Sequence, residues 1–145
     1  MKAPVHLFLT IDNDRLGELV SNVEGTSEER CGFLLGHDQA TRIVTAVVPA
    51  LNVAATDRHL RFEIDPLEYL RAEQYAAAHQ LELLGIYHSH PNTVAVPSET
   101  DRREAYPNFS YVILSVMRQR FADIRSWRLN HRLEFEEETV IHFKK

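Results

Sequence analysis

A chain of 145 residues, with 44% hydrophobic and 26% charged residues, can bury a sizeable core and is predicted to form one globular domain over residues 1–145. Its formal net charge of −5 argues against a nucleic-acid surface, and no stretch approaches the roughly 20 apolar residues that would cross a membrane. The single cysteine, Cys31, excludes an intramolecular disulfide framework and, with no secretory signal at the amino terminus, favours a cytoplasmic location.

Apolar periodicity predicts the elements of the first half of the chain. In chain order we expect a strand at 5–10, a helix over about 12–23 capped by Asp12 or Asn13, two paired and buried strands at 31–36 and 42–50, a loop at 51–59, and a short strand at 61–64. A second helix is expected from Pro66, with Asp65 as its N-cap.

In the second half of the chain, the pattern of apolar residues predicts mostly strands. We expect a strand at 81–90, a short helix after its N-cap Ser98, and strands at 111–117, 121–129 and 133–143. The acidic run EFEEET (134–139) is interpreted as the solvated face of an edge strand, where charge discourages aggregation. Together these elements predict an α/β fold in which a central mixed β-sheet is flanked by helices.

The stretch IYHSHPNTVAVPSETD (86–101) points most clearly to chemistry. His88 and His90 lie two residues apart at the end of a predicted strand, so both imidazoles face one side of the sheet. Asp101 falls in the first turn of the following helix and offers a third ligand. Two histidines and one carboxylate leave a coordination position open, as a catalytic zinc requires. A His-x-His pair is also common on protein surfaces. The pair alone therefore does not decide between a metal site and two surface histidines.

The order His-Ser-His-Pro, Ser98, Asp101 resembles the motif of the JAMM (MPN+) metallopeptidases. That family also carries a glutamate far upstream, just before a strand. The segment EERCGFLLG (28–36) resembles its Glu-x-Cys-Gly pattern and singles out Glu29. Resemblance to small prokaryotic members extends over most of the chain, and it implies the deaminase-like JAMM/MPN fold.

The resemblance also implies a role for each matching residue. His88, His90 and Asp101 are expected to bind Zn²⁺, which is the only cofactor expected. Glu29 is expected to take a proton from the zinc-bound water and pass it to the leaving amine, and Ser98 to donate a hydrogen bond to the oxyanion. Without the rest of the motif, Glu29 would be interpreted as a solvated charge in a surface turn. Ser98 would be interpreted as a helix N-cap. Cys31 is expected to be a small buried core residue rather than a nucleophile.

The implied reaction is hydrolysis of an amide at the C-terminal Gly-Gly tail of a ubiquitin-like or sulfur-carrier protein. Small prokaryotic members act on sulfur carriers, and this chain has little room for the insertions of eukaryotic members. An extended tail is expected in a groove beside the zinc, with residues 61–64 and 92–96 as candidates to flank it.

Two alternatives come from other functional classes. Proteins of this fold that have lost their ligands act as scaffolds or binding modules, and one bacterial branch is associated with DNA repair. The intact ligand set argues against the first, and Asn-Thr-Val-Ala after His90-Pro91, where that branch is glycine-rich, argues against the second. The chain has no His-Glu-x-x-His, no Pro-Cys-x-x-Cys and no glycine-rich phosphate loop. The sequence gives no oligomeric state.

Overall fold

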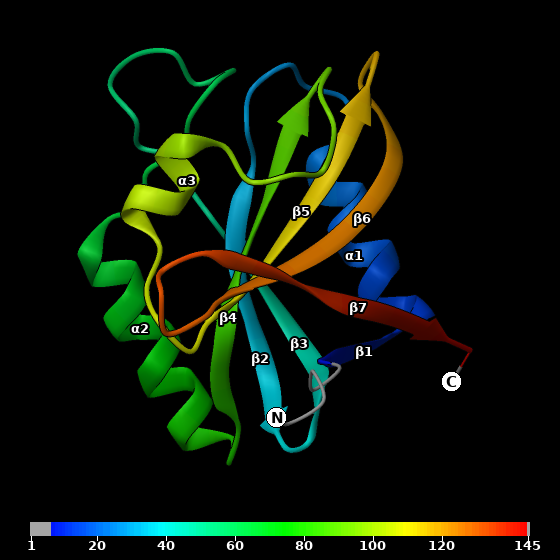
Figure 1. Cartoon of the computed structure of the whole chain (residues 1–145), viewed down its shortest axis with the longest axis vertical. Coiled ribbons are helices and arrows are strands. Elements are labelled where there is room, and N and C mark those ends of the chain that lie inside the picture. Colours follow the sequence, from blue (N-terminus) through cyan, green and yellow to red (C-terminus); the bar gives the residue numbers. More distant parts are fainter. Residues whose placement is uncertain (1–6, 145) are drawn as a thin grey trace.

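The structure, a computed structural model, describes residues 7–144 (Figure 1). Its elements in chain order are β1 (Phe8–Asp12), α1 (Asn13–Val23), β2 (Cys31–Asp38), β3 (Thr41–Ala50), α2 (Pro66–Ala78), β4 (Glu82–Pro91), α3 (Glu99–Glu104), β5 (Ser110–Met117), β6 (Arg120–Leu129) and β7 (Phe135–Phe143). The predicted first strand is confirmed from Phe8 onward, while residues 5 and 6 lie outside the described residues.

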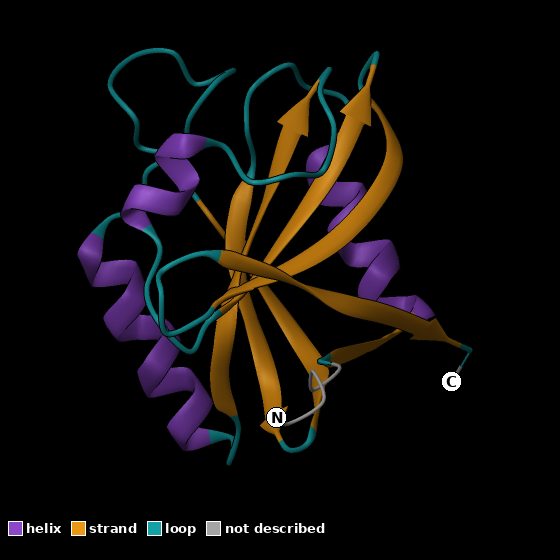
Figure 2. Cartoon of the chain, in the orientation of Figure 1, coloured by secondary structure: helices purple, strands orange, loops and turns teal. Residues whose placement is uncertain are grey.

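The strands form one mixed sheet that closes into a barrel in the order β1-β3-β2-β4-β5-β6-β7. β2 lies antiparallel between β3 and β4, and β4 runs parallel to β5. β1 pairs in parallel with both β3 and β7 and thereby closes the barrel. Helices α1 and α2 lie on opposite sides of the sheet (Figure 2). The predicted α/β fold with a mixed sheet flanked by helices is confirmed, and closure of the barrel is a feature that the prediction lacked.

Side-chain alternation along the central strands divides the core into two clusters. On β2, Leu34 packs with the cluster that contains α1, whereas its neighbour Phe33 packs with the cluster under α2. On β4, Tyr87 joins the α1 cluster and Ile86 the α2 cluster. Because side chains on a strand alternate, His88 projects to the same side of the sheet as Ile86, the side that α2 covers.

The helices begin where the sequence predicts. Asp12 accepts a hydrogen bond of 2.8 Å from the backbone N–H of Arg15 and caps α1. Asp65 caps α2 in the same way through Leu67, with Pro66 in the first turn. Within the described part of the chain, no helix has the length and apolar character that crossing a membrane requires.

The short strand predicted at 61–64 is wrong. This segment is irregular because its backbone is hydrogen-bonded by a side chain and a loop rather than by a neighbouring strand. The Asn52 amide donates to the carbonyl of Arg61 at 3.1 Å and accepts from the N–H of Glu63 at 3.1 Å. The backbone N–H of Val53 donates to the Glu63 carbonyl at 2.8 Å.

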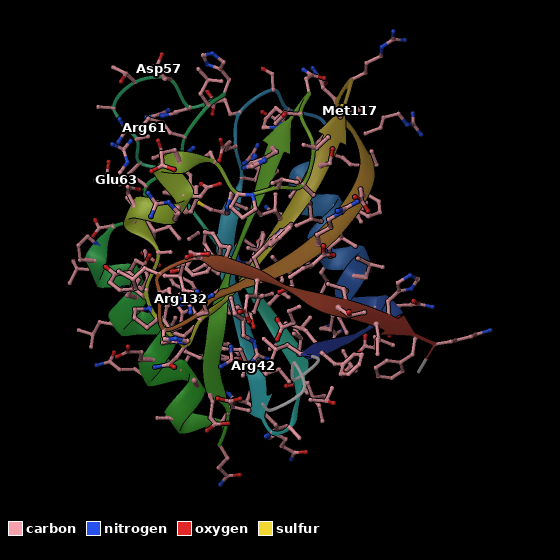
Figure 3. All side chains as sticks on the ribbon, in the orientation of Figure 1. Arg42, Asp57, Arg61, Glu63, Met117 and Arg132 are labelled. Atoms are coloured by element: carbon pink, nitrogen blue, oxygen red, sulfur yellow. The ribbon has the colours of Figure 1, made fainter. Side chains whose placement is uncertain are left out.

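The interpretation of the acidic run as the solvated face of an edge strand is wrong about the edge, although Glu134, Glu136 and Glu137 are exposed as expected. β7 is paired on both sides, with β6 and with β1. Glu138 is fully buried, forms an ion pair with Arg128, and accepts hydrogen bonds of 2.7 Å from the hydroxyls of Ser110 and Ser126. Arg42, labelled in Figure 3, donates to the Ser110 hydroxyl at 2.9 Å. Arg128 therefore offsets the buried carboxylate directly, and Arg42 reaches it only through the Ser110 hydroxyl.

Candidate metal centre

Four of the five predicted site residues meet at the end of β4. The rings of His88 and His90 lie with their centroids 5.0 Å apart, which confirms that both face one side of the sheet. Asp101, in the first turn of α3, places its Oδ2 atom 3.1 Å from Nε2 of His90 and 3.7 Å from Nε2 of His88. Glu29 Oε1 lies 3.4 Å from Nδ1 of His88. Glu29 and both histidines are at most 5% exposed.

The pairing of β2 with β4 brings Glu29 to the histidines. The antiparallel register sets Cys31 opposite His88. Beyond the regular strand, the N–H of Ser89 donates to the Arg30 carbonyl at 2.9 Å, and the Arg30 N–H donates to the Ser89 hydroxyl at 2.8 Å. These two bonds tie the residue between the histidines to the residue after Glu29. Glu29 is therefore a buried residue of the site. It is not the solvated charge in a surface turn that its sequence neighbours alone indicate.

A backbone carbonyl orients the imidazole of His90. Nδ1 of His90 lies 2.9 Å from the carbonyl oxygen of Val94, which can only accept, so this nitrogen carries the ring proton. In the neutral ring, Nε2 then presents a lone pair to the Asp101 carboxylate. Two lone pairs at 3.1 Å repel unless a proton or a metal cation lies between them. This arrangement of the second ring nitrogen is the one found in metal-binding histidines.

Ser98 and Asp101 hold each other in a capping box at the start of α3. The Asp101 N–H donates to the Ser98 hydroxyl at 3.0 Å, and the Ser98 N–H donates to Asp101 Oδ2 at 2.9 Å. The predicted helix cap is confirmed. The Ser98 oxygen acts here as an acceptor, which leaves its hydroxyl proton available to another partner.

The charges of the site act on each other. Burial alone lowers the pKa of His88, but the carboxylates of Asp101 and Glu29 outweigh burial and raise this pKa above its usual value. Burial alone raises the pKa of Asp101, but the neighbouring imidazoles of His88 and His90 and the hydrogen bond from the Ser98 N–H hold this pKa below its usual range. Two carboxylates beside two imidazoles thus favour positive charge at this point.

The donor atoms fit a divalent metal ion. Ligands that bind zinc tetrahedrally at 2.0–2.1 Å lie about 3.3 Å from one another. The separations of Asp101 Oδ2 from the two Nε2 atoms, 3.1 and 3.7 Å, fall on either side of this value. Glu29, His88 and His90 also offer one donor atom each within 4.8 Å of the others. Glu29 Oε1 and His88 Nδ1 are buried without a hydrogen bond, which is costly unless a further group binds between or beside them.

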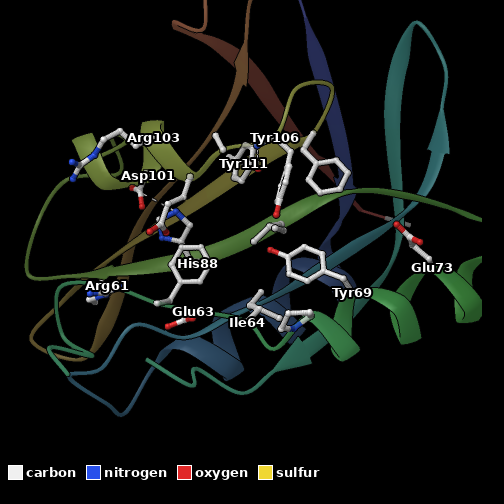
Figure 4. A pocket seen from close by; sticks show the side chains of 16 residues that line it. Arg61, Glu63, Ile64, Tyr69, Glu73, His88, Asp101, Arg103, Tyr106 and Tyr111 are labelled. Atoms are coloured by element: carbon white, nitrogen blue, oxygen red, sulfur yellow. Dashed lines mark hydrogen bonds and ion pairs between the residues drawn. The ribbon is translucent and has the colours of Figure 1, made fainter. Parts of the chain in front are cut away.

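A cavity of about 800 Å³ opens beside His88 and Asp101 and runs between α2 and the segment after α3 (Figure 4). The 61–64 segment lines it, as predicted for a groove-forming segment. The 92–96 loop is not among its lining residues within the described chain; it contacts the site through Val94 and His90. Aromatic side chains make up much of the wall, namely Phe62, Tyr69, Tyr106, Phe109 and Tyr111.

Sequence reasoning missed two contacts around this centre, since Phe62 was expected only as part of the flanking segment 61–64 and Asn52 was not expected there at all. Phe62 stacks on the imidazole of His88, and Asn52 donates a hydrogen bond of 2.9 Å to the carbonyl of Glu29. Neither lies near its partner in the sequence or belongs to a recognisable spacing. No local signal was therefore available for either contact.

A model of the prokaryotic homologs of the JAB domain matches residues 19–130, which is more than half of the chain. The chain belongs to the prokaryotic JAB family. The recognition of a small prokaryotic JAMM/MPN protein from the Glu29, His88, His90, Ser98 and Asp101 pattern is thereby confirmed.

Three named relatives of this prokaryotic JAB protein differ in how much they share with it. A desampylase of Haloferax volcanii is 42% identical over 60% of the chain and 62% of the relative, so the match spans less than two thirds of that protein. A desampylase of Pyrococcus furiosus is 29% identical over 92% of the chain and 89% of the relative. A probable TtuB-protein conjugate cleaving protease of Thermus thermophilus is 40% identical over 50% of the chain and 48% of the relative.

Solved structures agree with this placement. Protein DSY2949 of Desulfitobacterium hafniense superposes with a TM-score of 0.83 at 30% identity, covering 95% of this chain and 94% of that protein. A protein of Salinibacter ruber gives a TM-score of 0.68 at 36% identity, covering 93% and 91%. These two structures therefore share the fold over most of the chain.

Proposed function

We propose that this protein is a zinc-dependent peptidase or isopeptidase that hydrolyses an amide bond at the C-terminal Gly-Gly tail of a ubiquitin-like or sulfur-carrier protein. The observation that carries the proposal is the group of three buried residues, His88, His90 and Glu29, with the partly buried Asp101 at one end of a cavity. The names of the relatives, two desampylases and a probable TtuB-conjugate protease, support the substrate class.

His88, His90 and Asp101 are proposed as the metal ligands, through the two Nε2 atoms and Oδ2. A Zn²⁺ ion held there would lower the pKa of water towards ~7 and polarise the amide carbonyl. The Val94 carbonyl keeps His90 in the tautomer that leaves Nε2 free to bind. The capping box fixes the Asp101 carboxylate on the side of the two imidazoles.

Glu29 is proposed as the general base and then the general acid. Its Oε1 lies 3.4 Å from Nδ1 of His88, the ring nitrogen that the proposed ligand set does not use, whereas Asp101 Oδ2 lies 3.7 Å from Nε2. Glu29 makes no hydrogen bond through Oε1, so this oxygen is free to accept a proton from the attacking water. Passing that proton to the leaving nitrogen completes the cleavage, because an amine leaves more readily than an amide anion.

Ser98 is proposed to stabilise the oxyanion that forms on the amide carbonyl. Its hydroxyl oxygen already accepts from the Asp101 N–H, which fixes the direction of the side chain. The remaining hydroxyl proton can donate where negative charge develops. Capping α3 and stabilising an oxyanion use different atoms of the same hydroxyl, so the two roles do not conflict.

The cavity beside the metal centre is proposed to hold the extended chain on one side of the cleaved bond. A Gly-Gly tail has no side chains, so it can lie close to Phe62 and Asp101, which line this cavity. The aromatic wall beyond offers apolar surface to the bulkier residues that precede the glycines. A reducing compartment such as the cytoplasm is proposed as the location, since the one cysteine is buried and unpaired.

The test has two stages. Elemental analysis of protein purified without chelator is expected to give about one zinc per chain, lost in His88→Ala/His90→Ala. Wild-type protein is then incubated with a sulfur carrier joined through its Gly-Gly terminus to the lysine side chain of a reporter peptide. Release of the peptide is expected from the wild type and not from Glu29→Gln, which keeps its zinc.

Each outcome has a clear consequence. Zinc binding together with Glu29-dependent release supports the proposal. A wild-type protein that neither contains zinc nor takes it up contradicts the hydrolase and favours a binding module of the same fold. Zinc binding without cleavage of any Gly-Gly conjugate contradicts the substrate class.

A further inference from the structure

We propose that Asn52 is a positioning residue that fixes Glu29 relative to the wall of the cavity beside His88. This inference rests on the proposed role of Glu29 as the proton carrier. Asn52 follows β3 and lies outside the motif, and it touches no metal-ligand side chain. It acts through the backbone of the residues it holds.

The amide of Asn52 makes four hydrogen bonds to the backbone of three segments. Nδ2 donates to the Glu29 carbonyl at 2.9 Å and to the Arg61 carbonyl at 3.1 Å. Oδ1 accepts from the N–H groups of Ala54 and Glu63, both at 3.1 Å. An asparagine amide has two N–H donors and one oxygen with two lone pairs, so every position is used.

Only one orientation of the amide satisfies these partners. Rotating the group by half a turn would set the Asn52 oxygen against two carbonyl oxygens and its NH₂ against two N–H groups. The side chain is therefore fixed in direction by its surroundings, and a substitution with a different donor and acceptor pattern breaks at least half of the contacts.

We call the Asn52 side chain and its four backbone hydrogen bonds the Asn52 clamp. At one end of this clamp, both peptide groups of Glu29 are held. Asn52 binds the Glu29 carbonyl, while the Glu29 N–H donates to the Arg58 carbonyl at 2.6 Å. Arg58 is itself tied back, since its Nε donates to the Ala54 carbonyl at 2.7 Å. The loop after β3 thus determines where the peptide groups of Glu29 lie, and with them the start of its side chain.

The other end of the clamp holds the cavity wall. The two bonds to Arg61 and Glu63 flank Phe62, whose ring stacks on His88 at a centroid distance of 4.5 Å. One side-chain amide therefore connects the backbone of the proton carrier with the backbone of the residue that covers a metal-ligand imidazole. Loosening this link displaces reacting groups from each other, and misplacement by about 1 Å can cost on the order of a hundredfold in rate.

Two substitutions separate the halves of the clamp. Asn52→Ala removes all four bonds, whereas Asn52→Asp keeps the acceptor and replaces both donated bonds with repulsion between oxygens. In hydrogen exchange without substrate, Asn52→Ala is expected to speed exchange at the Ala54 and Glu63 amides at least tenfold, and Asn52→Asp to leave these amides closer to wild type. Unchanged protection at both amides in Asn52→Ala would overturn the clamp.

Steady-state kinetics of the Asn52 variants then test whether the clamp affects catalysis. Both variants are expected to keep about one zinc per chain and to lose roughly tenfold to a hundredfold in kcat on the carrier conjugate. In the Glu29→Gln background, Asn52→Ala is expected to lower the residual rate less than twofold, since the group it positions is gone. An equal loss in both backgrounds, or an unchanged kcat, overturns the positioning role.

Asn130→Ala is the matched control. Asn130 also uses its amide to tie a loop, donating to Glu136 at 3.1 Å and accepting from the N–H groups of Arg132 and Glu134, but it lies in the β6–β7 turn. Its loss is expected to lower stability without changing kcat. Absence of cleavage by the wild type overturns the proposed function and the kinetic role of Asn52 with it. Exchange at Glu63 still decides separately whether the clamp exists.

Discussion

The ring of Phe62 lies stacked on the imidazole of His88, with centroids 4.5 Å apart and an interplanar angle of 26°. The two residues come from an irregular loop segment and from the end of β4. The stack restricts rotation of the imidazole and shields one of its faces from water. A residue outside the motif thus helps to orient a proposed metal ligand.

Phe62→Ala is expected to weaken zinc binding about tenfold, because His88 loses the surface that orients it. Competition with a chromophoric chelator measures the dissociation constant. Tyr75→Ala is the control, since Tyr75 stacks on His79 at 4.0 Å on the outer part of α2 and its removal is expected to leave zinc affinity unchanged. An unaltered dissociation constant in Phe62→Ala would contradict the orienting role.

Ser98→Ala is expected to lower kcat about a hundredfold, through loss of the oxyanion donor, and to lower the free energy of unfolding by about 1 kcal/mol, through loss of the α3 cap. Denaturant unfolding and steady-state kinetics separate the two effects. Asp12→Ala removes the N-cap of α1 and is expected to cost similar stability with kcat unchanged. If kcat falls equally in both variants, the loss reflects stability and not oxyanion binding.

Cys31 is expected to resist thiol reagents at pH 8 in the folded protein. Burial, reinforced by the nearby Glu29 carboxylate, raises the pKa of its thiol to about 12, so the thiolate is scarce at this pH. In urea the thiol regains an ordinary pKa near 8.5 and should react rapidly. Reaction with a chromogenic disulfide reagent, with and without urea, makes the comparison. Equal rates would show that the thiol is accessible in the folded state.

Glu138→Ala is expected to lower the free energy of unfolding by about 3–5 kcal/mol, because it leaves the buried guanidinium of Arg128 without its carboxylate. Urea unfolding followed by circular dichroism measures the change. Glu137→Ala is the neighbouring control: its 3.7 Å pair with Arg125 is about half exposed, and its loss is expected to cost less than about 1 kcal/mol. Similar costs for both would refute the buried network as a source of stability.

Features that depend on nearby residues could be predicted from the sequence. The N-caps Asp12, Asp65 and Ser98 act within three residues of their partners, and the period of two along a strand places His88 and His90 on one face. Glu29 could be found only through its resemblance to a family pattern, since its charged neighbours resemble any surface turn.

Contacts between distant segments determined the structure of the 61–64 segment and of the acidic run. The 61–64 segment has the alternation of a strand, yet Asn52, nine residues or more away, binds its backbone before any strand can. The acidic run has the charge of an exposed edge, yet β7 is paired on both sides and Glu138 lies buried opposite Ser126 and beside Arg128. The sequence by itself indicated the His88 and His90 pair and the helix caps, because these depend on spacing along one element. The tertiary structure alone determined which backbone groups and charges are satisfied from distant segments, because those partners are set by how the barrel closes.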